Sequence, residues 1–294
     1  EEVTYQWEIV RQATWQADFA DAYFLNDQTG WVVGTGGKIA RTTDGGKTWR
    51  PQHSSVKDDL RRMTFVDADH GWIAGRGVLL KTENGGETWQ VIKGVLQNFR
   101  NISTMQFLNA QEGWLGVDQV QTLHTTDGGL TWKLQKTGTT NAAITDLHFI
   151  NSKEGWAIAP QRRDGGFILH TVNGGDYWEI QEKTNQPGVA IHFADAKSGW
   201  VVMGNGTSLV TDDDGVTWKL RASAVDGRIL RVNFRNHTEA WGIGSGGAIF
   251  MTHNQGESWG TVYVALDGED GLAGASPSPA ESLTAEQGEG ERKE

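Results

Sequence analysis

The chain has 294 residues, of which 37% are hydrophobic, so it is long enough to bury a sizeable core. It contains 39 glycines and 14 tryptophans but no cysteine, which favours short strands and tight turns and excludes disulfides and thiolate metal sites. The formal net charge is -11, but residues 267–294 alone carry eight acids and two bases, so the body of the chain is only mildly acidic. No segment approaches the ~20 apolar residues of a membrane span, and we expect no membrane insertion.

The first predicted element is a strand over Trp7-Glu8-Ile9-Val10. Six repeats follow it, and each contains a turn motif, or box, whose first copy is Thr42-Thr43-Asp44-Gly45-Gly46-Lys47-Thr48-Trp49. The later copies occupy residues 82–89, 125–132, 171–178, 211–218 and 252–259. The box tryptophans are 40 to 46 residues apart, which is the length of a four-stranded propeller blade.

The second repeat illustrates the four strands, called a to d. We predict strand a over residues 60–66, strand b over 71–74, strand c over 78–82 and strand d over 89–92, with the box as the turn between c and d. Each repeat has a phenylalanine near the end of strand a: Phe24, Phe65, Phe107, Phe149, Phe193 and Phe234. Strand b begins with a Gly-Trp step in five repeats and with Ala240-Trp241 in the last.

These patterns predict an all-β protein, a β-propeller of four-stranded blades over residues 1–265. We expect six full repeats plus an N-terminal strand that packs on the edge of the ring, where it would protect an exposed sheet edge. The alternative is a seven-bladed propeller with an incomplete last blade, in which the strand at Trp7 is the fourth strand. Residues 266–294 form an acidic Ser/Pro/Gly/Glu-rich segment with too little apolar content to fold, and we predict a disordered tail.

The third box position alternates between aspartate and asparagine: Asp44, Asn84, Asp127, Asn173, Asp213 and Asn254. Either side chain can accept hydrogen bonds from nearby backbone N–H groups in a tight turn. A carboxylate needed for catalysis or for Ca²⁺ would not be exchanged so freely, so we interpret the box as structural.

The pattern Ser/Thr-x-Asp-x-Gly-x-Thr-Trp resembles the Asp-box, or bacterial neuraminidase repeat. The longer unit from Phe65-Val66-Asp67 through Gly71-Trp72 and Leu79-Leu80-Lys81-Thr82 to the box is similar to the photosystem II stability/assembly factor family. That resemblance implies an exported propeller, periplasmic or in a thylakoid-lumen-like compartment, that acts as a non-catalytic scaffold and binds newly made reaction-centre protein. Family members are described as seven-bladed.

The alternative function is a carbohydrate-active enzyme or glycan-binding propeller, such as a sialidase-like glycoside hydrolase. The nearest match to the sialidase Arg-Ile-Pro motif is Arg228-Ile229-Leu230, and Tyr23 has no evident glutamate partner. His148 and His192 share one strand-a position in neighbouring blades, and we interpret their proximity as packing. We therefore predict no catalytic residue, no metal site and no cofactor.

Arginines gather at the loops that open away from the boxes, namely the d–a and b–c loops. We predict that Arg61, Arg62, Arg76, Arg100, Arg162, Arg163, Arg228 and Arg231 form a partner-binding face. Arginine suits this role because it forms planar bidentate contacts with carboxylates. The alternative is that these are solvated surface charges. A second basic row precedes the boxes at Arg41, Lys81, His124 and His170, and Val210 and Met251 interrupt it.

The predicted partner is a protein, a subunit of a membrane-protein complex. We expect no nucleic-acid partner and a monomeric chain.

Overall fold

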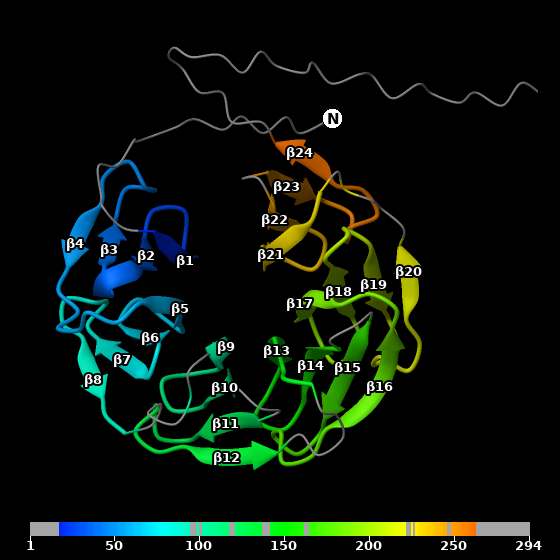
Figure 1. Ribbon diagram of the computed structural model, residues 1–294, viewed down its shortest axis with the longest axis horizontal. Coiled ribbons are helices and arrows are strands. Elements are labelled where there is room, and N and C mark those ends of the chain that lie inside the picture. The colour runs from blue at the N-terminus through cyan, green and yellow to red at the C-terminus, as the bar shows by residue number, and fades with distance from the viewer. Residues whose placement is uncertain are drawn as a thin grey trace, which may run out of the picture.

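The computed structural model describes residues 18–94, 99, 102–117, 121–136, 142–161, 165–221, 225, 227–245 and 248–262. These residues form six four-stranded antiparallel sheets arranged around a common axis, a six-bladed β-propeller (Figure 1). The prediction of an all-β propeller with six full repeats is therefore confirmed. The strand predicted at Trp7–Val10, the strands that a seventh blade would need, and the tail at 266–294 lie outside the described residues.

Within each blade the strands follow chain order from the axis outward. Blade 1 consists of β1 (Phe19–Phe24), β2 (Gly30–Gly34), β3 (Ile39–Thr42) and β4 (Arg50–Gln52), with a short 3-10 turn η1 (Thr35–Gly37). Blade 2 consists of β5 (Leu60–Phe65), β6 (His70–Gly75), β7 (Val78–Glu83) and β8 (Gln90–Ile92). Blade 3 consists of β9 (Ile102–Phe107), β10 (Gly113–Val117), β11 (Gln121–Thr125) and β12 (Lys133–Lys136).

Blade 4 consists of β13 (Asp146–Phe149), β14 (Gly155–Pro160), β15 (Gly166–Thr171) and β16 (Glu179–Thr184). Blade 5 consists of β17 (Gly188–Phe193), β18 (Gly199–Met203), β19 (Ser208–Thr211) and β20 (Lys219–Arg221). Blade 6 consists of β21 (Ile229–Phe234), β22 (Ala240–Gly244), β23 (Ile249–Thr252) and β24 (Gly260–Val262). Among the described residues, no helix has the length and apolar character needed to cross a membrane.

The core lies between consecutive blades, where the face of one blade packs on the next. The strand-b tryptophan Trp31 stacks on Phe65 of blade 2 with ring centroids 3.8 Å apart, and both side chains are buried. Phe65 in turn meets Trp89, the box tryptophan of its own blade, edge-on. The same stack recurs at Trp72–Phe107, Trp114–Phe149 and Trp156–Phe193. Each Gly-Trp step therefore joins its blade to the next one.

Candidate functional site

The box is a turn held by its own side chains. In blade 1, Oδ1 of Asp44 accepts hydrogen bonds from the Thr42 hydroxyl and from the Thr48 backbone N–H, each at 2.8 Å. In blade 2, Oδ1 of Asn84 accepts the same two bonds from Thr82 and Thr88, each at 3.0 Å. Aspartate and asparagine share this oxygen, so the turn does not require a negative charge.

The hydroxyl of Thr48 donates to Asp44 Oδ2, whereas the Asn84 amide donates to the hydroxyl of Thr88. Hydrogen bonds from Thr48 are the main reason that the pKa of Asp44 falls to about 2. Asp44 is therefore ionised at neutral pH, and its oxygens are used by the turn itself.

Each box is tied to the a–b loop of its own blade. The Gly45 N–H donates to the Gln28 carbonyl at 2.9 Å, and the Gly85 N–H donates to the Asp69 carbonyl at 2.9 Å. Gly45 has φ of 72°, a conformation that glycine adopts without steric cost. The boxes and the a–b loops thus lie together on one end of the propeller, which we call the box face.

The box also accepts a bond from the preceding blade. The indole N–H of Trp31 donates to the Gly85 carbonyl at 3.1 Å, and that of Trp72 donates to the Gly128 carbonyl at 2.9 Å. Trp114 and Gly174 repeat this contact at 2.9 Å. This contact between the tryptophan and the box recurs from blade to blade and holds neighbouring blades together.

The basic row before the boxes packs against these tryptophans. Arg41 lies over the Trp31 ring at 5.3 Å, and Lys81 lies over Trp72 at 6.0 Å. His124 and His170 stack on Trp114 and Trp156, each with ring centroids 4.6 Å apart. This row lies inside the blade junctions, where it supports the tryptophan stack.

We use the name arginine face for the end opposite the box face, where the sequence interpretation places the arginines that it singles out. Arg76 is exposed in the β6–β7 turn, Arg228 is exposed just before β21, and Arg231 is exposed on β21. Arg61 and Arg62, on β5, are half-buried. Arg100, Arg162 and Arg163 lie outside the described residues.

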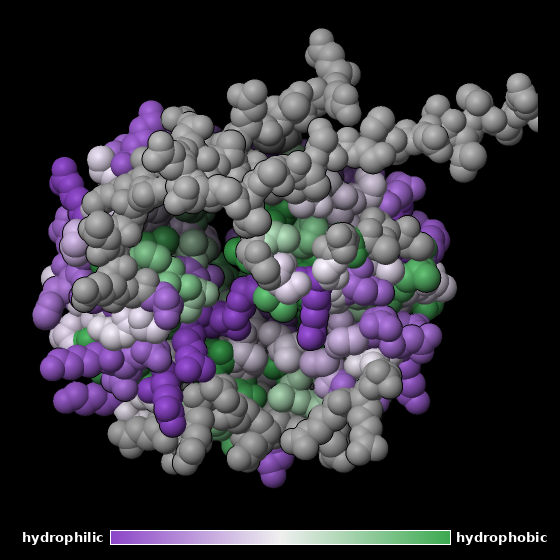
Figure 2. Space-filling view, turned by 45° about the horizontal axis from the view of Figure 1, so that its top comes forward, coloured by the Kyte–Doolittle hydropathy of each residue, from purple (hydrophilic) through white to green (hydrophobic). Residues whose placement is uncertain are grey.

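Five of these arginines thus belong to only two of the six blades. Figure 2 shows hydrophilic side chains reaching into the hollow at the middle of the molecule.

A ring of equivalent residues lies on the innermost strands, three positions before the strand-a phenylalanine. Its members are Asp21, Arg62, Thr104, Asp146, Ala190 and Arg231. Asp21 Oδ2 accepts the Met63 backbone N–H at 2.8 Å, which joins blade 1 to blade 2. Asp146 accepts the Thr104 hydroxyl at 2.8 Å and the Ile191 N–H at 3.0 Å, which joins blade 4 to both of its neighbours.

Arg62 is one of the two cations in this ring, and its side chain is hydrogen-bonded to blade 3. Its Nε donates to the Ser103 carbonyl at 2.7 Å. Burial, and then the nearby charge of Arg231, lower the pKa of Arg62 to about 10. Burial raises the pKa of Asp21, although the Met63 N–H and the charges of Arg62 and Arg231 act in the opposite direction. Burial also raises the pKa of Asp146. Arg62 is therefore part of the blade packing as well as of the arginine face.

The sequence interpretation identified Arg62 and Arg231 but missed Asp21 and Asp146. The constant offset of three residues from the strand-a phenylalanine is the pattern that would have found them.

The two histidines of the innermost strands come from neighbouring blades, His148 from β13 and His192 from β17. The rings of His148 and His192 lie edge to face, with centroids 4.8 Å apart. Burial lowers the pKa of His148 to about 3 and that of His192 to about 4. Both imidazoles are therefore neutral at neutral pH.

A cavity of about 390 Å³ lies between blades 1 and 2, next to the outermost strand β4. Its lining includes Arg41, Arg50, His53 and a single carboxylate, Glu87. Hydrolysis by the usual glycosidase mechanism needs two carboxyl groups flanking the bond, and this cavity lining offers one.

The fold and the box together define the protein class: an Asp-box β-propeller whose blades are joined by tryptophan–phenylalanine stacks. The profile of the family described as "Photosynthesis system II assembly factor YCF48" matches residues 1–99, 95–189 and 179–288. These matches span most of the chain, and the chain belongs to this family.

Two relatives show the range of the similarity. The chain is 26% identical over 266 residues to the chloroplastic photosystem II stability/assembly factor HCF136 of Arabidopsis thaliana, covering 81% of this chain and 66% of that protein. It is 23% identical over 267 residues to the photosystem II assembly lipoprotein Ycf48 of Synechococcus sp. (strain CC9902), covering 88% of this chain and 79% of that protein.

Solved structures agree on the fold. A structure described as "YCF48 bound to D1 peptide" matches with a TM-score of 0.66 and 22% identity, over 85% of this chain and 82% of that one. A GH74 xyloglucanase from Xanthomonas campestris matches with a TM-score of 0.60 and 11% identity, over 79% of this chain and 45% of that one. At these identities the similarity establishes the propeller fold and nothing about activity.

Proposed function

We propose that this protein is a non-catalytic scaffold for photosystem II assembly and that it binds a polypeptide segment of a photosystem II subunit on its arginine face. The family membership across nearly the whole chain carries this proposal. Curated relatives are named as photosystem II assembly factors, and one related propeller is described as bound to a D1 peptide. The proposed partner is a subunit of a membrane-protein complex, bound by a monomeric propeller.

The chemistry of the arginine face supports a peptide ligand. Arg76, Arg228 and Arg231 are exposed, and a guanidinium group can form two parallel hydrogen bonds to a carboxylate. Arg62 and the half-buried Asp21 near it provide a polar base close to Arg231. An extended segment with acidic side chains or a free carboxyl terminus would complement this surface.

The relatives' names also guide the proposed location. One relative is chloroplastic and another is a lipoprotein. We place this protein by analogy in an exported, periplasmic or thylakoid-lumen-like compartment. A glycosidase function receives no comparable support, since the GH74 neighbour shares only 11% identity.

Charge reversal on the exposed arginines tests the proposal. The triple variant Arg76→Glu, Arg228→Glu and Arg231→Glu should bind a synthetic D1 peptide at least about tenfold more weakly, because each reversed charge repels an acidic ligand. Its melting temperature should stay near that of the unmodified protein.

The matched control reverses three exposed lysines on the box face, with Lys47→Glu, Lys153→Glu and Lys197→Glu. It changes the net charge equally and should leave peptide affinity within about twofold. Equal affinity of the two triple variants would refute a partner site on the arginine face.

A further inference from the structure

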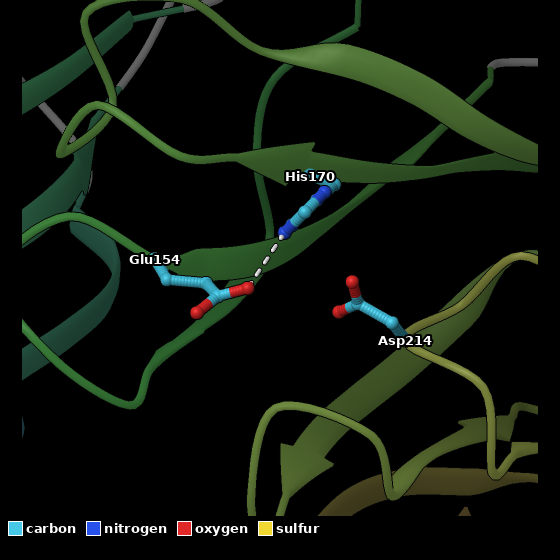
Figure 3. A group of neighbouring side chains, drawn as sticks. All are labelled: Glu154, His170 and Asp214. Carbon is cyan, nitrogen blue, oxygen red and sulfur yellow. Dashed lines mark ion pairs between the residues drawn. The ribbon is translucent and has the colours of Figure 1, made fainter.

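Three potential metal ligands converge at the junction of blades 4 and 5 on the box face. Glu154 lies in the β13–β14 loop, His170 lies on β15, and Asp214 lies in the box of blade 5. Figure 3 shows their functional groups directed toward one another. One ligand atom from each residue lies within 4.8 Å of the other two. The three residues come from separate segments of two blades, so only the folded propeller brings them together.

The backbone around each ligand is fixed by the repeat. The His170 ring stacks on Trp156, and the Glu154 N–H donates to Oδ1 of Asn151 at 2.9 Å. The Asp214 N–H donates to the Lys197 carbonyl at 3.2 Å, and the Asp214 carbonyl accepts the Gln181 side-chain amide at 2.7 Å. The three side chains are thus presented from preorganised positions.

Two of the converging atoms are buried without a hydrogen bond to any described residue. These atoms are Nε2 of His170 and Oδ1 of Asp214. Shielded polar atoms without partners are costly, so two of them in one cluster of three residues call for an explanation. The His170 Nε2 atom lies 3.5 Å from Oε1 of Glu154. This is close to the ~3.3 Å between two ligands on a tetrahedral zinc ion with bonds of about 2.0–2.1 Å.

The preceding junction offers an internal comparison. There Glu112 and His124 form the equivalent pair, with His124 Nε2 at 3.1 Å from Glu112 Oε1, within hydrogen-bonding distance. The third position is Gly174, which has no side chain. The corresponding residue is also glycine at Gly45, Gly85 and Gly128, and Asp214 takes its place with φ of 66°. A carboxylate facing the Glu-His pair is therefore a specific feature of the junction of blades 4 and 5.

We propose that Glu154, His170 and Asp214 bind one divalent transition-metal ion, with Zn²⁺ as the best match, and that this ion links blade 4 to blade 5. One imidazole and two carboxylates are ordinary zinc ligands, and a water molecule would complete four-coordination. Ca²⁺ is a poorer match, because it takes six to eight oxygen ligands and no imidazole. The proposal is independent of the partner-binding role of the arginine face.

Metal titration of the chelator-treated full chain tests the proposal. Calorimetry with Zn²⁺ should give one site per chain, and bound Zn²⁺ should raise the melting temperature because only the folded chain assembles the ligands. Co²⁺ should give visible absorption bands of a four-coordinate site. Asp214→Gly should weaken Zn²⁺ binding at least tenfold and should fold, since four other boxes carry glycine at this position. His170→Gln should weaken it similarly.

The control is His53→Gln, which removes an exposed imidazole from blade 1 and should leave Zn²⁺ affinity unchanged. A Zn²⁺ affinity that is the same in the unmodified chain, Asp214→Gly and His170→Gln would overturn the proposal. So would the absence of any Zn²⁺-induced rise in melting temperature. In that case the cluster holds only the 3.5 Å pair of His170 with Glu154, and Asp214 lies beside it without binding a metal.

Discussion

The junction between blades 2 and 3 and the junction between blades 5 and 6 use the same tryptophan in different ways. Trp72 stacks on Phe107 at 3.6 Å with 5° between the ring planes, and its indole N–H donates to the Gly128 carbonyl. Trp200 is equally buried, but it meets Phe234 edge-on at 77°. Its indole N–H makes no hydrogen bond to a described residue. The repeat therefore sets where the tryptophan lies, and the neighbouring blade decides how many interactions it makes.

The side chains around the two tryptophans explain part of this difference. Lys81 lies over Trp72 on strand c, whereas Val210 occupies that position beside Trp200. Phe107 is 6% exposed, whereas Phe234 is only partly buried. The junction of blades 5 and 6 thus lacks the tight sandwich of the junction of blades 2 and 3.

Two side chains on blades 1 and 6 are more exposed than their equivalents in other blades. Phe24 of blade 1 is 48% exposed, whereas its equivalent Phe65 is 3% exposed. On blade 6, Ile243 is 57% exposed, whereas its equivalent Val202 is fully buried. These two positions are therefore less tightly packed on blades 1 and 6 than on blades 2 and 5.

The largest expected effect comes from removing the stacked tryptophan. Trp72→Ala should lower the free energy of unfolding by about 3–5 kcal/mol, the usual loss for a buried tryptophan. Trp200→Ala should cost about 1–2 kcal/mol less, since Trp200 has neither the parallel stack nor the indole hydrogen bond. Urea denaturation followed by circular dichroism measures both.

Tyr177→Ala serves as the control for these two variants, because Tyr177 is 52% exposed and its loss should be nearly neutral. Equal losses for Trp72→Ala and Trp200→Ala would contradict the difference between the two junctions.

A smaller change isolates the hydrogen bond. Trp72→Phe keeps an aromatic ring against Phe107 but leaves the buried Gly128 carbonyl without its donor, which should cost roughly 1–3 kcal/mol in addition to the lost volume. Trp200→Phe removes an N–H that has no partner among the described residues, so only the volume loss remains. In the same urea titration, Trp72→Phe should lose about 1 kcal/mol or more of unfolding free energy beyond the loss for Trp200→Phe. A larger loss for Trp200→Phe would show that its indole N–H does have a partner.

The sequence predicted the propeller well because the same turn and strand motifs recur in every repeat. The Asp/Asn-Gly-Gly turn and the Gly-Trp step fix the positions of strands b, c and d, and the predicted strand at residues 78–82 agrees with β7 within one residue. Local patterns do not specify how a tryptophan packs on the next blade. The edge-on contact of Trp200 with Phe234 joins two blades, and the repeat pattern alone does not distinguish it from the stacked form seen at the other junctions.

The candidate sites were harder to predict from the sequence for a similar reason. Clusters such as Asp21 with Arg62, or Glu154 with His170 and Asp214, join residues from different blades. The aspartate at position 214 stands out only when the boxes are aligned, because glycine occupies this place in four of them. Charge counting found the arginines, but it did not show that Arg62 is half-buried and bonded to the Ser103 carbonyl.

The smallest expected effect concerns the box that each junction contains. The box at the junction of blades 2 and 3 has Asp127, whereas the one at the junction of blades 5 and 6 has Asn254. Slight burial alone would raise the pKa of Asp127, but hydrogen bonds from Thr131 and Thr125 outweigh it and hold this pKa below its usual value. The unfolded chain therefore takes up this proton first as the pH falls. The contribution of Asp127 to stability is complete above its unfolded pKa and is lost as the pH drops through the lower, folded pKa.

Asp127→Asn should remove this part of the acid sensitivity, and Asn254→Asp should add a similar sensitivity at the other junction. Melting temperatures measured between about pH 5 and pH 2 would reveal both as changes of slope. Asp44 and Asp213, whose pKa values are both lowered to about 2, remain in both variants and supply the common acid-sensitive background. If Asn254→Asp gives no added slope, the looser junction does not build the hydroxyl contacts that lower the pKa of Asp127. The box geometry would then depend on the tryptophan packing beside it.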